Sequence, residues 1–367
     1  MHGLYIHIPF CVSKCLYCDF YSLTYVPQLM DRYIGALLTE ADSYKGMGFS
    51  TLYIGGGTPS LLGPARLTQL FDGLSRRFDL EDLQEATIEV NPDSAGRDFL
   101  ANAYDLGINR LSIGAQSLDS EELRKAGRAH DRRQVLETIN AAQSSGFQNI
   151  SVDVMIGLPG QTAQSLCDTL DTLIGAGIKH VSAYCLSIEE GTSFCRYPPP
   201  DLPGEADLVC LFEKAVDIFE AHSFTHYEIS NFALHGHECL HNLNYWRGGE
   251  YIGLGTAAAS HMGGERFRNA ACLERYLEGP SSIREAVERL DEEHKAGEEA
   301  MLRLRLIAEG LHIKEMAGRY GPDALDSLEV RLDQLVSRKM LVRDDHVFRL
   351  PPGSAMTSNS VFVDVIG

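Results

Sequence analysis

The chain has 367 residues, of which 44% are hydrophobic and 23% charged, and its formal net charge is −19. This composition is ordinary for a folded globular protein, and the length allows one large domain and a smaller one. The negative charge argues against broad electrostatic capture of nucleic acid or anionic lipid, so we expect proteins or small molecules as partners.

Runs rich in strand-forming residues alternate with segments of helical periodicity over the first 221 residues. The expected strands cover residues 4–8, 51–57, 86–90, 110–116, 150–158 and 180–188. The expected helices cover residues 27–45, 65–78, 98–107, 132–146, 163–177 and 205–221. Six strand–helix repeats predict an α/β fold with a parallel sheet covered by helices. The nearly continuous apolar run in residues 150–158 fits a strand buried on both faces.

The pattern changes after this alternation. A proline-rich loop at residues 197–203 precedes a region rich in histidine, glycine and aromatic residues. From residue 285 onward we expect helices at 298–310, 312–321 and 324–340, then short strands at 341–350 and 361–366. Helices followed by a hairpin resemble a winged-helix module. We therefore predict three parts, at residues 1–223, 224–284 and 285–367.

Three cysteines, Cys11, Cys15 and Cys18, lie within eight residues directly after the first expected strand. Thiolates are the usual ligands of iron–sulfur clusters, and this loop supplies three of them without a fourth. One iron of a four-iron cluster would then be open, as at metal sites that bind a ligand. The alternatives are three ordinary buried cysteines or part of a zinc knuckle, but the chain has no second CxxC pair to complete such a zinc site.

The remaining cysteines are scattered, and they indicate a reducing, cytoplasmic compartment. They are Cys167, Cys185, Cys195, Cys210, Cys239 and Cys272. No signal peptide precedes Tyr5. No apolar run approaches the roughly 20 residues that span a bilayer, so we expect any membrane association to be peripheral.

Several polar residues fall at the carboxyl ends of the expected strands, where α/β folds place their sites. The segment GGGTP, which contains Gly57 and Thr58, follows the second strand. Consecutive glycines let a ligand approach the backbone, although such a segment equally fits a tight turn. A carboxylate within a buried strand, as at Asp153, needs a partner or ligand. Glu89 has an alternative role as a cap of the following helix. Arg128 has an alternative as a solvated arginine on a helix.

The CxxxCxxC loop, with Tyr17 before its last cysteine, resembles the signature of the radical S-adenosylmethionine (SAM) superfamily. From Leu4 to the C-terminal tail, the chain is similar to the oxygen-independent coproporphyrinogen oxidases and their relatives, the HemW haem chaperones. The resemblance implies an incomplete (β/α)6 barrel, a [4Fe-4S] cluster on the three cysteines, and SAM on the fourth iron. It also implies that SAM is contacted by Tyr5, Tyr17, Gly57, Thr58, Glu89, Gln116, Arg128 and Asp153.

A histidine-rich segment follows the expected barrel. His235, His237, Cys239 and His241 alternate, which would place them on one strand face as a metal or haem-iron site, although chance alternation in a loop fits equally. Residues 241–246 match the HNxxYW motif of HemW-type proteins, and residues 227–233 match their YEISNFA segment. Imidazole is the commonest axial haem ligand, so His241 is the first haem candidate and Cys239 the second.

Two departures from the oxidase pattern favour a haem chaperone. Phe20 stands where the oxidases carry a fourth cysteine, and the chain starts almost at the first strand instead of with their long extension. We therefore expect a protein that binds haem, a [4Fe-4S] cluster and SAM and delivers haem to haem-requiring proteins, including ones at the membrane. The alternative is the oxidase itself, which decarboxylates porphyrinogen propionates, so the sequence leaves open whether the protein is an enzyme.

A third hypothesis is a metal-sensing winged-helix regulator. The candidate helix at residues 312–321 carries few basic residues and lies in an acidic domain. Recognition of nucleic acid needs a basic face, so a lid or docking domain is favoured and no nucleic-acid partner is expected.

Overall fold

The computed structural model describes residues 2–280 and 284–366, which form a mixed sheet of 12 strands with helices around it. Its centre is a parallel ladder in chain order, as the six strand–helix repeats predict. The ladder comprises β1 (His2–Ile8), β4 (Thr51–Gly56), β5 (Glu85–Val90), β6 (Arg110–Gln116), β7 (Asn149–Ile156) and β8 (His180–Cys185).

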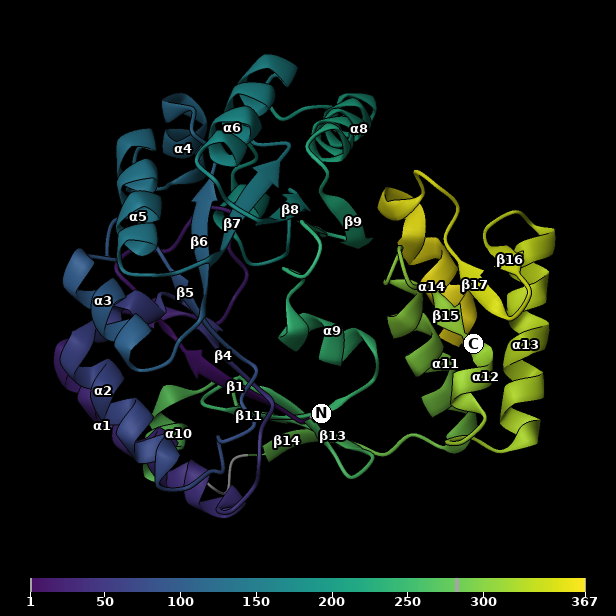
Figure 1. Cartoon of the computed structure of the whole chain (residues 1–367), viewed down its shortest axis with the longest axis horizontal. Helices are drawn as coiled ribbons and strands as arrows, with labels where there is room; N and C mark the ends of the chain where they lie inside the picture. The colour runs from purple at the N-terminus through teal and green to yellow at the C-terminus, as the bar shows by residue number, and fades with distance from the viewer. Residues whose placement is uncertain (1, 281–283, 367) are drawn as a thin grey trace.

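Helices that follow these strands cover the outer face of the sheet (Figure 1). They are α1 (Pro27–Ala41), α2 (Gly63–Ser75), α3 (Arg97–Asp105), α5 (Arg132–Ser144), α6 (Ala163–Gly175) and α8 (Glu205–Ala221). In α2 the buried residues Leu67, Leu70 and Leu74 recur at helical spacing and turn one apolar face to the sheet. Because the outer face is covered, a ligand reaches the sheet from the strand ends or from the inner face.

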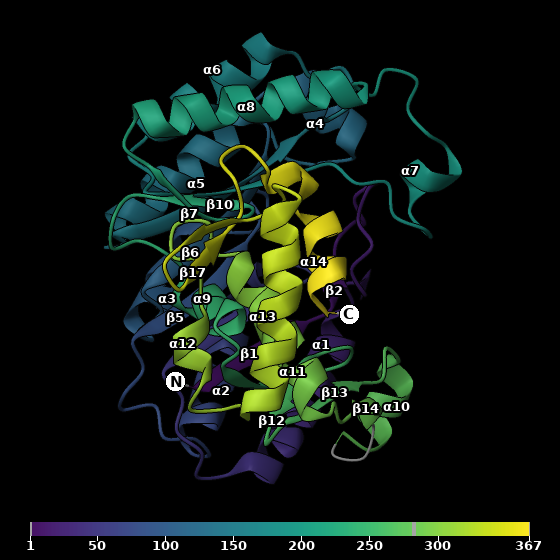
Figure 2. The same ribbon diagram turned by 90° about the vertical axis from the view of Figure 1, so that its right-hand side faces the viewer.

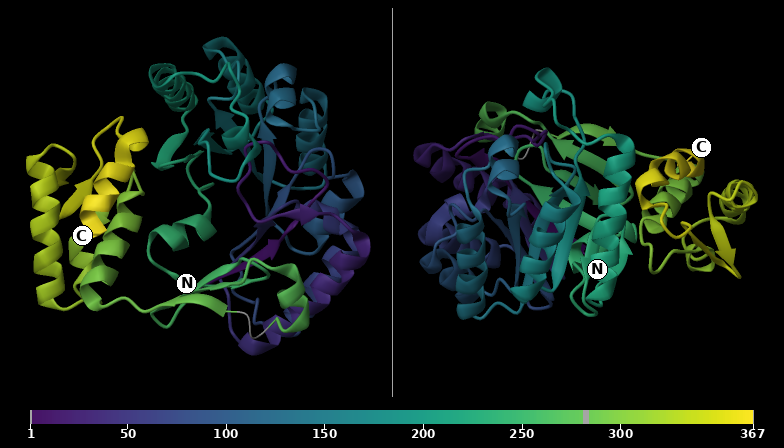
Figure 3. Two further views of the ribbon diagram at one scale, coloured as in Figure 1. Left: turned by 180° about the vertical axis from the view of Figure 1, so that it is seen from behind. Right: turned by 90° about the horizontal axis from the view of Figure 1, so that it is seen from above.

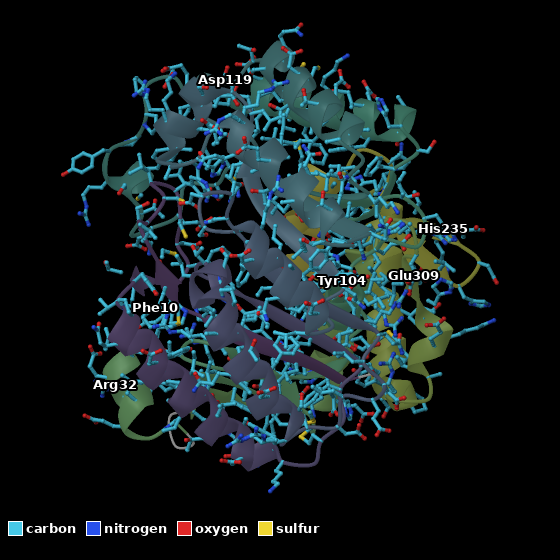
Figure 4. All side chains as sticks on the ribbon, turned by 60° about the vertical axis from the view of Figure 1, so that its left-hand side comes forward. Phe10, Arg32, Tyr104, Asp119, His235 and Glu309 are labelled. Atoms are coloured by element: carbon cyan, nitrogen blue, oxygen red, sulfur yellow. The ribbon has the colours of Figure 1, made fainter. Side chains whose placement is uncertain are left out.

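Short elements connect the main ones and shape the open edge of the sheet. They are β2 (Phe10–Cys11), β3 (Leu23–Thr24), η1 (Asp42–Tyr44), η2 (Pro59–Leu62), α4 (Ser120–Ala126) and α7 (Ser193–Arg196). Pairing of β2 with β3 closes the cysteine loop at its base. Figure 4 labels Phe10, the residue directly before Cys11, next to side chains drawn with yellow sulfur atoms.

The region after α8 extends both edges of the same sheet. β9 (Thr225–Glu228) and β10 (Asn231–Ala233) follow β8, whereas β11 (Glu250–Leu254), β12 (Ala259–Met262), β13 (Glu265–Asn269) and β14 (Arg284–Glu288) continue from β1. Between them lies α9 (Leu240–Trp246), and α10 (Leu273–Glu278) packs near α1. The alternating histidines do not share a strand face, so the alternative of a loop applies. His235 lies in a turn with Gly236 at φ 83°, and His241 lies on α9.

The last part of the chain has its own apolar core beside the sheet (Figures 2 and 3). It contains α11 (Glu292–Leu304), β15 (Leu311–His312), α12 (Ile313–Met316), α13 (Pro322–Ser337), β16 (Val342–Asp344), β17 (Val347–Arg349), η3 (Ala355–Thr357) and α14 (Ser358–Ile366). The short strand expected at 341–350 is instead a hairpin of two strands, β16 and β17. The strand expected at 361–366 is wrong, because Val361, Phe362 and Val365 are buried on one face of a helix that packs on α11.

This C-terminal part is joined to the sheet through α9. The Arg305 guanidinium lies 4.4 Å from the centre of the Trp246 ring, and Arg247 forms a 2.7 Å ion pair with Glu309. Figure 4 labels Glu309 on the same side of the molecule as His235. Leu306 adds apolar contact with the α9 side. None of the helices in the described residues is long and apolar enough to cross a membrane.

Candidate functional site

A cavity of about 410 Å³ opens at the carboxyl ends of the central strands, next to the cysteine loop. Almost every residue predicted for the site lines it. Those residues are Cys11, Cys15, Cys18, Tyr17, Gly57, Thr58, Glu89, Gln116, Arg128 and Asp153. The fold thus brings together side chains that are up to 142 positions apart in the chain, as parallel strand ends are expected to do.

The cysteine loop is held by backbone hydrogen bonds at its centre. Leu16 donates its N–H to the Ala126 carbonyl at 3.2 Å, and its own carbonyl accepts from the Phe194 N–H at 3.0 Å. The Thr58 hydroxyl donates to the Cys11 sulfur at 3.6 Å. Burial raises the pKa of both Cys11 and Cys18, so these thiols need a metal or cationic partner to ionise.

A zinc ion and a four-iron cluster need different arrangements of their ligands. Within residues 2–280 and 284–366, no three His, Cys, Asp or Glu side chains converge on one metal-ion position. A mononuclear zinc site needs such convergence. A four-iron cluster does not, because each thiolate binds a different iron. Three sulfur donors around one cavity therefore fit a cluster by their chemistry.

Arg128 lies in the cavity wall, so its description as a solvated helical arginine is wrong. Its guanidinium donates to the Cys15 sulfur at 3.2 Å, to Asn91 Oδ1 at 2.9 Å and to the Gly114 carbonyl at 2.7 Å. The cause is local, since α4 ends at Gly127 in the left-handed conformation with φ 75° and the chain leaves the helix there. A glycine directly before the arginine was the sequence signal for this turn.

Two partly buried carboxyl groups, Glu89 and Asp153, form the polar floor of the cavity. Glu89 accepts from the Tyr53 hydroxyl at 2.9 Å and from the Gly56 N–H at 3.1 Å. Asp153 accepts from the Ser112 hydroxyl at 3.0 Å, which supplies the partner that its buried strand requires. Burial and the neighbouring Asp153 raise the pKa of Glu89 to about 7, and burial also raises that of Asp153.

The wall contributes further polar groups that sequence reasoning did not assign to the site. Ser112 and Tyr184 line the cavity, and each lies in a central strand. Their position in the strand–helix alternation was the available signal, but residue type alone did not separate them from ordinary surface groups.

Tyr5 is the predicted site residue that does not line the cavity. Its hydroxyl is 2.9 Å from His7 Nδ1, and its ring stacks on Tyr53 at 6.2 Å between centroids. His7 Nε2 lies 3.1 Å from the Tyr21 carbonyl, so His7 is a core histidine bonded to backbone. Tyr5 therefore stands behind the cavity floor and supports it.

The two haem candidates are buried on the inner side of the sheet. His241 is 1% exposed, and its ring nitrogens are bonded to the Thr51 hydroxyl at 2.8 Å and the Tyr245 hydroxyl at 2.7 Å. Cys239 is fully buried, and its sulfur lies 3.4 Å from Glu85 Oε1. Burial raises the pKa of the Cys239 thiol to about 12. Neither side chain presents a free donor atom in this arrangement.

Comparisons with known proteins agree with this site. Residues 5–173 match the radical SAM superfamily, and residues 290–353 match the HemN C-terminal domain. The heme chaperone HemW of Lactococcus lactis is 32% identical over 365 residues, which covers 98% of this chain and 96% of that protein. HemW of Bacillus subtilis is 34% identical over 379 residues and covers both chains fully. The chain belongs to the HemW family.

For this HemW-family chain, membership of the radical SAM superfamily implies a [4Fe-4S] cluster and SAM as cofactors. The crystal structure of the coproporphyrinogen III oxidase HemN of Escherichia coli superposes with a TM-score of 0.86, covering 99% of this chain and 89% of the oxidase. The two sequences are 21% identical, so this similarity shows a shared radical SAM α/β fold.

Proposed function

We propose that this protein is a haem chaperone that binds haem, a [4Fe-4S] cluster and SAM and delivers haem to haem-requiring proteins. The observation that carries the proposal is similarity over the whole chain to two relatives named heme chaperone HemW. Phe20 supports it, because it lines the cavity and is 64% exposed at the position where the oxidases have a fourth cysteine.

Within the cavity, Cys11, Cys15 and Cys18 would hold three irons of the cluster. The SAM contacts would come from Tyr17, Gly57, Thr58, Glu89, Gln116, Arg128 and Asp153, with Tyr5 acting from behind the floor. When bound, the cluster and SAM supply one-electron chemistry. The Arg128 guanidinium, 3.2 Å from Cys15, would stabilise the thiolate charge and orient the loop.

The alternative function is oxygen-independent coproporphyrinogen oxidation. The HemN superposition supports this alternative only as far as the fold. The fourth cysteine of the oxidases has no counterpart in this sequence, where Phe20 stands at that position. A chaperone role therefore explains more of the chain.

The finer description of the fold is part of this proposal. The six parallel strands and their helices would form an incomplete (β/α)6 barrel over residues 1–223, with a connecting region at 224–284. Residues 285–367 would form a winged-helix-like docking domain. We also propose a cytoplasmic protein whose haem-accepting partners include membrane-associated ones.

The mode of haem attachment is a separate proposal, with His241 as first candidate ligand and Cys239 as second. Iron ligation by His241 would require its ring to give up the hydrogen bond to Thr51 or Tyr245. Haem titration of His241→Ala tests it, and a Soret band identical to that of the parent protein would remove His241 as ligand.

The function is tested with protein purified and reconstituted under strict anaerobiosis. We expect a Soret band on haem titration and no decarboxylated product from porphyrinogen with SAM and reductant. Cys18→Ser should fail to retain a four-iron cluster because two thiolates remain, whereas Cys210→Ser, on an exposed cysteine of α8, should retain it. Turnover of porphyrinogen would contradict the chaperone role, and full iron occupancy in Cys18→Ser would contradict the cluster assignment.

A further inference from the structure

The HNxxYW helix α9 is connected to the SAM cavity by an unbroken series of contacts. The series begins at His241, whose two ring nitrogens bond Thr51 on β4 and Tyr245 one turn along α9. Burial lowers the pKa of His241 to about 3, so the ring is neutral, with one nitrogen as donor and the other as acceptor. Since both nitrogens have partners, the orientation of the ring is fixed.

The fixed imidazole packs against Tyr53, two residues after Thr51 on the same face of β4. The two rings stack with centroids 5.3 Å apart at an angle of 28°. Tyr53 also stacks with Tyr5, with ring centroids 6.2 Å apart. Held in this way, Tyr53 directs its hydroxyl to Glu89 Oε1 at 2.9 Å. Glu89 is a cavity residue, and Tyr53, the side chain that donates to it, packs against His241 of α9.

The backbone of α9 is anchored to the same sheet. Glu85, the first residue of β5, accepts the N–H groups of Leu240 and His241, each at 3.0 Å. These N–H groups lie in the first turn of the helix and have no acceptor within it, so Glu85 supplies one. A carboxylate at this end also interacts favourably with the helix dipole. Glu85 and Glu89 lie on one strand, so β5 fixes the helix at one end and presents the cavity carboxylate at the other.

We propose that His241 is a positioning residue of the SAM site, which acts through Tyr53 to hold Glu89 in the orientation that binds SAM. The inference rests on the proposed assignment of Glu89 to SAM. It gives the HNxxYW motif a role that does not require a bond between His241 and haem iron. The motif would then serve SAM binding, although it lies outside the cavity wall.

The test measures SAM affinity by equilibrium dialysis with the full-length, cluster-reconstituted protein. Tyr53→Phe removes the donor to Glu89 and should weaken SAM binding about tenfold, the usual scale for a hydrogen bond to a charged group. His241→Ala should weaken it to a similar extent, and His241→Phe, which keeps a ring against Tyr53, should recover part of the loss. The double variant of Tyr53→Phe and His241→Ala should bind SAM as well as the single variant that has the lower affinity. The two effects should not add, because both substitutions act on one path.

Leu243→Ala is the matched control. Leu243 is also on α9 but packs toward Tyr227 and Leu306, so the variant loosens the helix without touching Tyr53. It should lower thermal stability and leave SAM affinity within about twofold of the parent, as expected for independent sites.

Three results would overturn the inference: unchanged SAM affinity in His241→Ala, fully additive effects in the double variant, or an equal loss in Leu243→Ala. A parent protein that binds no SAM would instead contradict the proposed function. Haem titration of the same variants tests whether His241 binds haem iron instead of positioning Glu89. Loss of the Soret band in His241→Ala with intact SAM affinity would identify His241 as a haem ligand and contradict the positioning role.

Discussion

Removal of the Glu85 carboxylate should be among the most destabilising single changes in this chain. The side chain is 3% exposed, accepts two backbone N–H groups of α9, and lies 4.0 Å from the Arg110 guanidinium, which is itself 2% exposed. In Glu85→Ala the N–H donors lose their acceptor and Arg110 loses its nearest counter-charge. Removing one partner of a buried ion pair costs about 3–5 kcal/mol, because the other charge stays buried.

The measurement is thermal and urea unfolding followed by circular dichroism. At about 2 °C per kcal/mol for a chain of this size, the expected fall in Tm is about 6–10 °C. Glu121→Ala is the control, because Glu121 forms an ion pair with Arg124 in which both side chains are about two-thirds exposed. Such an exposed pair contributes little to stability, because solvent screens it. Equal Tm values for the two variants would refute the argument that Glu85 anchors α9.

Buried neutral histidines should make the protein sensitive to mild acid. Burial lowers the pKa of His241 to about 3 and that of His130 to about 4, whereas the unfolded chain takes up these protons near pH 6.5. Folded pKa values below the unfolded ones mean that stability is lost as the pH falls below 6.5, by about 1.4 kcal/mol per histidine at pH 5.5. Urea unfolding at pH 7.5 and 5.5 tests this, and His130→Gln should show a smaller difference between the two pH values. Arg128→Lys should lower cluster retention in gel-filtered protein, because lysine cannot reproduce the forked contacts to Cys15, Asn91 and Gly114. Retention equal to that of the parent would show that those contacts do not hold the loop.

The sequence predicted the elements whose pattern is local. Periodicity located the central strands and outer helices within a few residues, with β6 and α8 at their observed bounds, and the spacing of strand ends gathered Glu89, Gln116 and Asp153 at one edge. The prediction of a strand at residues 361–366 was wrong. A short apolar run fits both strand and helix patterns, and packing of α14 on α11 decides between them.

The contacts that support the site could not be predicted from local patterns. Glu85 reaches the N–H of Leu240 across 155 positions, and Arg128 reaches the Cys15 sulfur across 113. Such pairs depend on how the inner face of the sheet meets α9 and the cysteine loop. The alternation of the histidines could not by itself decide between a shared strand face and a loop, because alternation carries meaning only within a strand, and here Gly236 at φ 83° lies between His235 and His237.

The join between α9 and the C-terminal part sets a limit on how this protein can be shortened. Arg305 covers the Trp246 ring and Leu306 completes a small apolar cluster with Leu243 and Tyr227, so the final part of the chain shields α9 from water. A fragment ending before Arg305 would expose an indole and several aliphatic groups on the helix that carries His241. We expect such a fragment to aggregate, so the smallest soluble unit that retains the SAM site should extend past α11.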